Sequence, residues 1–254
     1  MKGGDNRPEF SIVTVTRNNA DTIRDTLESV RRQVGPSVEH LVVDGQSDDA
    51  TTEIVREYPH VACHLREPDL GIYDAMNKGI RLATGGIVGF LNADDTFADD
   101  RVLERMAKTF RNTLCDATYG DLVYTDRESM GETVRHWRAG PCRPDSFAWG
   151  WMPPHPTFYA KRILYERYGD YRLSLGTAAD YELMLRFIHK HRIALTYIPT
   201  VLVKMRAGGA SNRNWKQRLA AHRNDREAWR VNGLVPRWFT LPAKPLRKIA
   251  QFLC

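Results

Sequence analysis

Two hydrophobic periodicities alternate along the first part of the chain. Continuous apolar or β-branched runs predict buried strands, and apolar residues three or four positions apart predict helices that cover them. The predicted strands are residues 10–16, 40–43, 61–65 and 87–91. The predicted helices are residues 47–55, residues 71–80 and a helix with Ile23, Leu27 and Val30 on one face. This alternation indicates an α/β protein with one mostly parallel sheet flanked by helices.

The regular alternation ends after Arg111. Later segments predict two antiparallel strands, an amphipathic helix, a further strand and a basic helix, at residues 118–124, 133–138, 178–188, 193–203 and around Trp215–Trp229. We therefore expect a main domain over residues 1–203, with one half at about 8–115 and the other at about 116–203, followed by a basic C-terminal helical extension over residues 204–254.

The composition is that of an ordinary soluble globular protein, with 42% hydrophobic and 27% charged residues among 254. No apolar run approaches the length of a membrane span, and the first residues lack a signal-peptide core. Four cysteines are scattered without metal-ligand spacing, which argues against a zinc site or a disulfide framework. These features predict a cytoplasmic protein in a reducing compartment.

Positive charge is concentrated in the C-terminal extension. This extension contains twelve Lys or Arg residues and two acidic residues, whereas the preceding 203 residues contain 25 basic and 29 acidic ones. Such segments bind nucleic acid, anionic lipid or phosphorylated substrates. Residues 235–253 also contain Trp, Phe and Leu, which suits a segment lying on an anionic membrane. The alternative is a tail that packs on its own domain or on a second subunit.

Paired carboxylates follow the fourth predicted strand directly, at Asp94 and Asp95. Adjacent negative charges repel unless a cation lies between them, and a hard divalent cation that also contacts phosphate is the usual partner. The alternative is a solvated turn that caps the helix beginning near Asp99.

Other polar residues lie at or near the ends of neighbouring strands. Thr14 and Thr16 belong to the first strand, and Asp44 ends the second. Ligands of parallel sheets bind at the carboxyl ends of the strands. Neither a G-x-G-x-x-G fingerprint nor a Walker A loop is present. Phosphate binding would therefore depend on a cation and on side chains.

The second half offers further candidates. Asp180 lies in the first turn of the helix over residues 178–188, where it either complements the helix dipole or faces a cleft as a general base. Residues 147–156 are rich in Trp and Pro. That loop is either a sugar-stacking surface or lid, or a cover for the core.

Taken together, these segments resemble the family 2 glycosyltransferases, inverting enzymes of the GT-A fold with a Rossmann-like sheet. The resemblance rests on residues 10–18, 42–51, 71–79, 92–95 and 179–182, in this order and spacing, and covers about the first 190 residues. The most similar proteins of this kind are bacterial transferases of capsule, exopolysaccharide or O-antigen assembly, of the colanic-acid type.

The resemblance implies roles for the donor side. Thr14 and Thr16 would lie beside the nucleotide, and Asp44 would bond its uracil or ribose. Three more residues would line the nucleotide pocket: Asp69, Asn77 and Lys78. The DxD-like motif corresponds to Asp94 and Asp95, with Asp95 as the expected ligand of Mn²⁺ or Mg²⁺ and Asp94 also near the nucleotide sugar.

The resemblance also implies roles for the acceptor side. Asp180 would be the catalytic base, while His155 and Trp151 would lie near the acceptor or the donor diphosphate. Two positions depart from the family pattern, because Asn92 begins the DxD-like motif and Ala179 replaces the first carboxylate of an ED-type motif. Asp180 is then the one base candidate in that motif.

The implied activity is transfer of a sugar from a nucleoside diphosphate, with UDP as the expected carrier, to a hydroxyl of a glycan or lipid-linked glycan in bacterial surface polysaccharide synthesis. The enzyme would act at the inner face of the cell membrane, without a nucleic acid partner. The alternatives are a nucleotidyltransferase of the nucleotide-sugar pyrophosphorylase type and a non-catalytic protein that binds through its basic tail.

Overall fold

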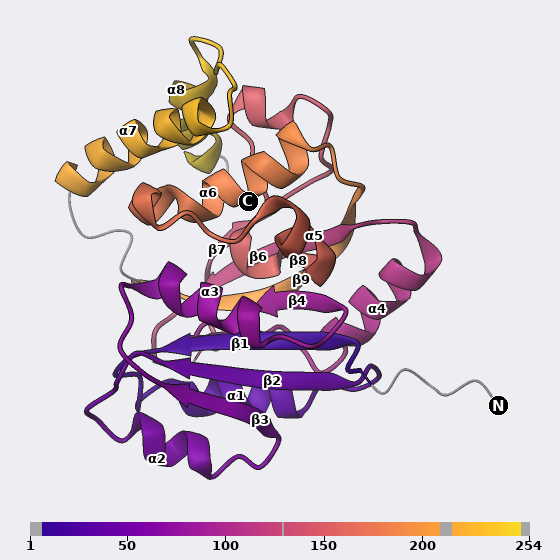
Figure 1. Cartoon of the computed structure of the whole chain (residues 1–254), viewed down its shortest axis with the longest axis vertical. Coiled ribbons are helices and arrows are strands. Elements are labelled where there is room, and N and C mark those ends of the chain that lie inside the picture. Colours follow the sequence, from indigo (N-terminus) through magenta and orange to yellow (C-terminus); the bar gives the residue numbers. More distant parts are fainter. Residues whose placement is uncertain (1–6, 129, 209–214, 250–254) are drawn as a thin grey trace.

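The structure is a computed structural model that describes residues 7–128, 130–208 and 215–249 (Figure 1). Its strands are β1 (Phe10–Thr16), β2 (Val38–Asp44), β3 (Val61–Arg66), β4 (Ile87–Phe90), β5 (Asp95–Phe97), β6 (Ala117–Thr125), β7 (Thr133–Trp137), β8 (Tyr159–Lys161) and β9 (Leu195–Arg206). The α-helices are α1 (Ile23–Arg31), α2 (Thr51–Arg56), α3 (Ile72–Leu82), α4 (Val102–Asn112), α5 (Arg162–Tyr168), α6 (Ala179–Met184), α7 (Trp215–Val231) and α8 (Thr240–Ile249). Shorter helical turns are η1 (Ser146–Trp149), η2 (His155–Thr157), η3 (Leu173–Ala178) and η4 (Leu185–Lys190).

The strands of the described residues form one sheet in the order β3-β2-β1-β4-β8-β6-β9-β5, with β7 beside β6. Strands β1 to β4 are mutually parallel, and the sequence predicts each of them correctly. The second half is mixed, because β8 runs antiparallel to both β4 and β6 while β9 runs parallel to β6. The predicted α/β class with a largely parallel sheet is confirmed, as is an antiparallel pair formed by β6 and β7.

Strand β5 does not appear in the sequence prediction. The chain was expected to turn after the strand over residues 87–91 and enter a helix, but β5 comes first and pairs antiparallel with β9. The Thr26 hydroxyl on α1 donates to the Asp95 carbonyl oxygen at 2.7 Å. The sheet therefore curls, so that β5 at one end of the strand order contacts a helix of the parallel half.

Helices cover both faces of the sheet. One face, with Val13 and Val15, packs against α3, α5, α6 and α7. The opposite face, with Phe10 and Ile12, packs against α4, while α1 and α2 share a smaller cluster beside β2. Helix α3 lies very close to β1, since a Cβ on Gly79 would come within 2.3 Å of a Val13 methyl group. This contact fixes the start of α3 near the carboxyl end of β1.

The C-terminal extension is joined closely to the rest of the protein. Strand β9 continues past the expected boundary at residue 203 to Arg206. Trp229 on α7 is fully buried and donates its indole N–H to the Tyr181 hydroxyl at 2.8 Å. Helices α7 and α8 lie together at one end of the molecule, beyond α6 (Figure 1). In the part of the chain that the structure describes, no helix is long and apolar enough to cross a membrane.

Candidate active site

The carboxyl ends of β1 and β2 lie side by side, with Thr16 opposite Asp44. Asp44 is fully buried. Its Oδ1 accepts hydrogen bonds from the Ser47 amide and hydroxyl at 2.8 and 2.7 Å, and its Oδ2 accepts one from Thr52 at 2.9 Å. Because both oxygens are engaged in this way, Asp44 shapes the turn between β2 and α2. This differs from the expected hydrogen bond to a nucleotide, for which the carboxylate offers no exposed oxygen.

The two threonines of β1 have different surroundings. Thr14 is buried, and its hydroxyl lies 3.0 Å from Nε2 of the buried His40. It therefore contacts the protein interior, in contrast to its expected place beside the nucleotide. Thr16 ends the strand and its hydroxyl donates to the Asn19 side chain at 3.2 Å. Thr16 lies at the sheet edge where ligands of parallel sheets bind.

The loop that carries Asp69 reaches over the end of β2. A Cβ on Gly45 would come within 2.2 Å of Asp69 Oδ2, so the Asp69 side chain lies directly against the backbone at the end of β2. Asp69 Oδ1 accepts a hydrogen bond from the Gly71 amide at 2.8 Å. Lys78 donates to the Pro68 carbonyl oxygen at 2.5 Å and pairs with Glu67 at 2.9 Å. Lys78 thus holds the loop, while Asp69 lies at the expected nucleotide edge.

Asn77 has a structural partner. Its side chain donates to the Tyr171 carbonyl oxygen at 2.8 Å and accepts from the Tyr171 amide at 2.9 Å. Both polar groups of this buried amide are therefore satisfied within the protein. The pair ties α3 to the segment before α6, although the resemblance implied that Asn77 lines the nucleotide pocket.

The segment between β4 and β5 brings the paired carboxylates to the end of β1. The Leu91 and Ala93 amides donate to the carbonyl oxygens of Val13 and Val15 at 3.0 and 3.4 Å. Asp94 is half-buried and Asp95 fully buried, as the first residue of β5. The alternative of a solvated turn that caps the next helix does not fit Asp95, because this residue is excluded from solvent. The carboxylate at the start of α4 is that of Asp99, which accepts a hydrogen bond from the Arg101 amide.

Burial raises the pKa of Asp94. It also raises the pKa of Asp95 well above its usual value, with a further contribution from the Asp94 charge. Arg206 of β9, which forms an ion pair with Asp25, opposes this shift in Asp95.

Asn92 Oδ1 and both oxygens of Asp95 are buried and accept no hydrogen bond of standard length and angle, although the Arg206 backbone and the Asn92 side chain lie close enough to Asp95 to lower its pKa. Buried acceptors without donors are unfavourable, and a hard divalent cation prefers such oxygen ligands. The described residues contain no group of three or more His, Cys, Asp or Glu side chains placed to hold a metal ion. If a divalent cation binds here, these residues would offer it one or two carboxylates and the Asn92 side-chain oxygen.

A second group of polar side chains surrounds Asp180 in the first turn of α6. His155 Nδ1 in η2 lies 3.5 Å from Asp180 Oδ2, and both side chains are partly exposed. The Tyr181 amide donates to Asp180 Oδ1 at 2.6 Å. Tyr73, in the first turn of α3, lies near Asp180, and its pKa is raised well above its usual value by burial, with a further contribution from the Asp180 charge. The tyrosine ring is supported by Tyr171 at a centroid distance of 5.3 Å.

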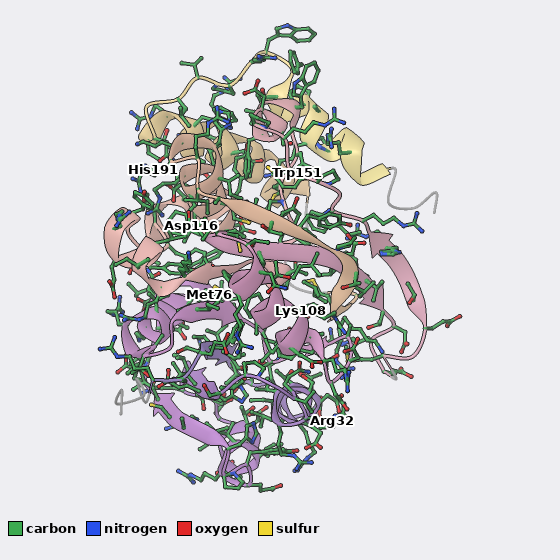
Figure 2. The ribbon with its side chains drawn as sticks, turned by 90° about the vertical axis from the view of Figure 1, so that its right-hand side faces the viewer. Arg32, Met76, Lys108, Asp116, Trp151 and His191 are labelled. Carbon is green, nitrogen blue, oxygen red and sulfur yellow. The ribbon has the colours of Figure 1, made fainter. Side chains whose placement is uncertain are left out.

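Trp151 belongs to the core. It is 7% exposed, its indole N–H donates to the Ala139 carbonyl oxygen at 2.8 Å, and its ring packs edge-on against Tyr119. Figure 2 labels Trp151 inside the fold, between the C-terminal helices and the sheet. The enclosed indole fits the alternative interpretation of this loop, namely a cover for the core. His155, from the same loop, does reach Asp180.

Residues 11–172 match the family model described as "Glycosyl transferase family 2", which is more than half of the chain. The chain therefore belongs to glycosyltransferase family 2. The resemblance stated from the motifs is confirmed.

Among its relatives is a PGL/p-HBAD biosynthesis glycosyltransferase of Mycobacterium bovis, 31% identical over 81% of this chain and 80% of that protein. A putative teichuronic acid biosynthesis glycosyltransferase, TuaG of Bacillus subtilis, is 32% identical over 39% of this chain and 41% of that one.

Solved structures agree on the fold. S. aureus TarS 1-349 in complex with UDP-GlcNAc superposes with a TM-score of 0.65 at 17% identity, over 88% of this chain and 65% of that one. The mannosyltransferase PcManGT from Pyrobaculum calidifontis, in complex with GDP-Man and Mn²⁺, gives 0.66 at 21% identity, over 97% and 72%. The curled sheet with flanking helices is thus the GT-A type. Family membership leaves no support for the nucleotidyltransferase and tail-binding alternatives.

Two residues of the site were not identified from the sequence. Tyr73 lies within the motif over residues 71–79, directly after Ile72 in the first turn of a helix. That position is a weak indication in the sequence that Tyr73 belongs to the site. Arg206 had no signal, because only the pairing of β9 with β5 brings this member of the basic extension to Asp95.

Proposed function

We propose that the chain transfers a sugar from a nucleoside diphosphate sugar, with UDP as the favoured carrier, to an acceptor hydroxyl with inversion at the anomeric carbon. The donor would bind at the carboxyl ends of β1 and β2, beside Thr16 and Asp69. This assignment is supported by the location of both residues at the edge where parallel sheets bind ligands and by the family to which the chain belongs.

The observation that carries the proposal is the arrangement around Asp180. A partly exposed carboxylate, oriented by the Tyr181 amide and flanked by His155 and Tyr73, is suited to accept a proton. We assign Asp180 as the general base that removes the proton from the acceptor hydroxyl as its oxygen attacks the sugar. Tyr73 would position the carboxylate through its hydroxyl, and His155 would orient it from the other side.

Asp94 and Asp95 would hold Mn²⁺ or Mg²⁺, and the buried side-chain oxygens of Asn92 and Asp95 support this assignment. A divalent cation bound there would offset the charge that develops on the departing nucleoside diphosphate. Of the two carboxylates, Asp94 is the one accessible to a ligand at the protein surface. Asp95 lies behind it, fixed by β5 pairing.

We further propose that the acceptor is a glycan or lipid-linked glycan of a bacterial surface polysaccharide or glycolipid, used at the cytoplasmic face of the membrane. The printed names of the relatives support this class, since one concerns PGL/p-HBAD and another teichuronic acid.

The test begins with thermal shifts measured with UDP-, GDP- and dTDP-sugars, each with and without Mn²⁺. We expect stabilisation by one nucleotide class, increased by the metal, because a ligand that binds only the folded state raises the melting temperature. Asp180→Asn should bind the donor as wild type does and lose transfer by about 10²–10⁴-fold. Wild-type transfer by Asp180→Asn would remove that residue from the mechanism, and no shift with any donor would contradict the donor site.

A further inference from the structure

Three aromatic rings form an exposed cluster at the end of the molecule built from α7 and α8. Trp238 is 90% exposed and Trp149, from the distant turn η1, is 52% exposed. Phe239 joins them, with ring centroids 4.8 Å from Trp149 and 5.5 Å from Trp238. Val235, three residues before Trp238, is 89% exposed. We call Trp149, Val235, Trp238 and Phe239 the aromatic cluster.

Arginines border the aromatic cluster. The Arg237 guanidinium lies 5.8 Å from the Trp149 ring centroid and 6.0 Å from that of Phe239. Arg247 is exposed, and its Nε–H donates a hydrogen bond to the Trp149 carbonyl oxygen at 3.1 Å. Positive charge is therefore held at the edge of an apolar surface, as in proteins that lie at a membrane interface.

A cavity of about 360 Å³ lies between α7 and α8. Its lining combines Arg223 and Arg226 of α7 with Leu241 and Pro242 of α8. Leu241 and Pro242 follow Phe239 by two and three positions, so the cavity and the aromatic cluster are continuous along the chain. The surface that faces the cavity is almost entirely apolar, which suits an apolar chain, and the two arginines of its lining add positive charge to this end of the molecule.

This surface is held firmly on the protein. Lys244 of α8 lies 2.8 Å from each carboxylate oxygen of Asp225 on α7. The Thr240 hydroxyl donates to the Ala148 carbonyl oxygen at 2.6 Å, and the backbone of Gly150 approaches Lys244 so closely that a Cβ would come within 2.6 Å of its nitrogen. These contacts fix α8 against η1, so that Trp149 meets Phe239.

We propose that the aromatic cluster and the arginine-lined cavity together dock the enzyme on an anionic lipid bilayer. The proposal rests on the proposed function in one respect, namely that the acceptor is presented at the membrane. Tryptophan favours the head-group region, where one part of the ring is apolar and the other wet. Arginines near an anionic surface add electrostatic attraction to lipid phosphates.

A second copy of the chain is a poorer occupant of this surface. In a two-fold contact the same patch would face itself, which would bring Arg223, Arg226, Arg237 and Arg247 of one copy against the same residues of the other. Like charges brought together at an interface cost free energy, whereas an anionic bilayer supplies the opposite charge. Charge complementarity therefore selects the lipid surface.

The test is sedimentation of the full chain with two kinds of vesicle. One is made of phosphatidylcholine alone, and the other contains about 30% phosphatidylglycerol, which supplies negative charge. We expect binding to the anionic vesicles, weaker binding in high salt, and little binding to the neutral ones. Trp238→Ser with Phe239→Ser, and separately Arg223→Gln with Arg226→Gln, should each weaken binding by about tenfold or more.

Matched controls remove comparable groups elsewhere. Leu114→Ser deletes an apolar side chain that is 98% exposed, and Arg81→Gln with Arg101→Gln deletes two exposed charges. Both controls should bind vesicles as wild type does. The proposal is overturned if the cluster variants bind unchanged, if neutral vesicles bind equally well, or if gel filtration shows a dimer that the Trp238→Ser variant dissociates.

Failure of the docking surface and failure of the proposed function give different results. The donor-dependent thermal shift should persist in the cluster variants, because none of their residues belongs to the proposed donor site beside Thr16 and Asp69 or to the group around Asp180. Asp180→Asn should in turn bind vesicles normally. Loss of vesicle binding with intact donor binding supports docking, whereas normal vesicle binding by the cluster variants rejects docking without touching the transfer activity.

Discussion

Buried His40 makes the stability of this protein depend on pH. Burial, with a smaller contribution from the neighbouring His60, lowers the pKa of His40 from 6.5 to about 3. In the unfolded chain His40 therefore becomes protonated near pH 6.5, whereas in the folded chain it becomes protonated only near pH 3. Stability is fully present above pH 6.5 and is lost progressively as the pH falls below it.

The magnitude follows from the shift. One pKa unit corresponds to about 1.36 kcal/mol, so at pH 5, which is about 1.5 units below the unfolded value, His40 alone costs about 2 kcal/mol of unfolding free energy. Burial also lowers the pKa of His60, which lies near Arg31 and Glu28, and of His64 beside Asp44. These two histidines add to the loss of stability on acidification, whereas Asp94 and Asp95, whose pKa values are raised in the folded protein, oppose it. The contribution of His40 is therefore measured as a difference between variants.

The assay is urea unfolding of wild type and His40→Gln at pH 7.5 and pH 5. His40→Gln is expected to be less stable at pH 7.5, because it disturbs the Thr14–His40–His60 chain of hydrogen bonds, but its decrease towards pH 5 should be smaller by about 2 kcal/mol. Thr14→Val is the control: it loses one of these bonds, keeps the histidine, and should retain the wild-type pH slope. Equal slopes for wild type and His40→Gln would refute the reasoning.

Three further predictions concern the core and the site. Gly89→Ala should lower stability by about 1–3 kcal/mol or more in urea unfolding, because its Cβ would come within 1.9 Å of the Tyr159 ring; an unchanged midpoint would mean that this ring moves freely. Glu182→Ala should lower the free energy of unfolding by about 3–5 kcal/mol in the same assay, because it leaves the buried Arg186 without its carboxylate partner at 3.0 Å. The control Glu166→Ala removes an exposed partner of Arg162 and should lower it by less than about 1 kcal/mol. Tyr73→Phe should keep its ring contact with Tyr171 and lower kcat by about tenfold or more with little change in KM; an unaltered kcat with an unaltered pH–rate profile would exclude a positioning role.

Local patterns in the sequence determined much of the parallel half. The strands over residues 10–16 and 61–65 and the helix over residues 71–80 lie within one or two residues of where periodicity placed them. The polar strand ends were also predicted, because the carboxyl edge of a parallel sheet follows from strand direction alone. Their individual contacts were not, since Asn77 meets Tyr171 across 94 positions of the chain. No local pattern encodes a pairing of that kind.

Burial was the harder quantity to infer. Trp151 and Trp149 occur two residues apart in one aromatic loop, yet the first is 7% exposed and the second 52%. The difference depends on Ala139 and Tyr119 beneath one ring and on Phe239 beside the other. Those partners come from three separate segments. The sequence could therefore indicate that the loop was aromatic, but only tertiary packing assigns one Trp to the core and the other to the surface.

The paired carboxylates show how a three-residue strand changes the expected chemistry. Sequence reasoning favoured Asp95 as the metal ligand, but β5 places Asp95 inside the sheet beside Arg206 and leaves Asp94 as the more accessible side chain. If Asp94 holds the cation and Asp95 supports it from behind, Asp94→Asn should abolish the Mn²⁺-dependent part of the thermal shift while the metal-free melting temperature stays near that of wild type. Asp95→Asn should instead alter the metal-free melting temperature, because it replaces a fully buried carboxyl group next to a buried arginine. The reverse pattern would return the principal ligand role to Asp95.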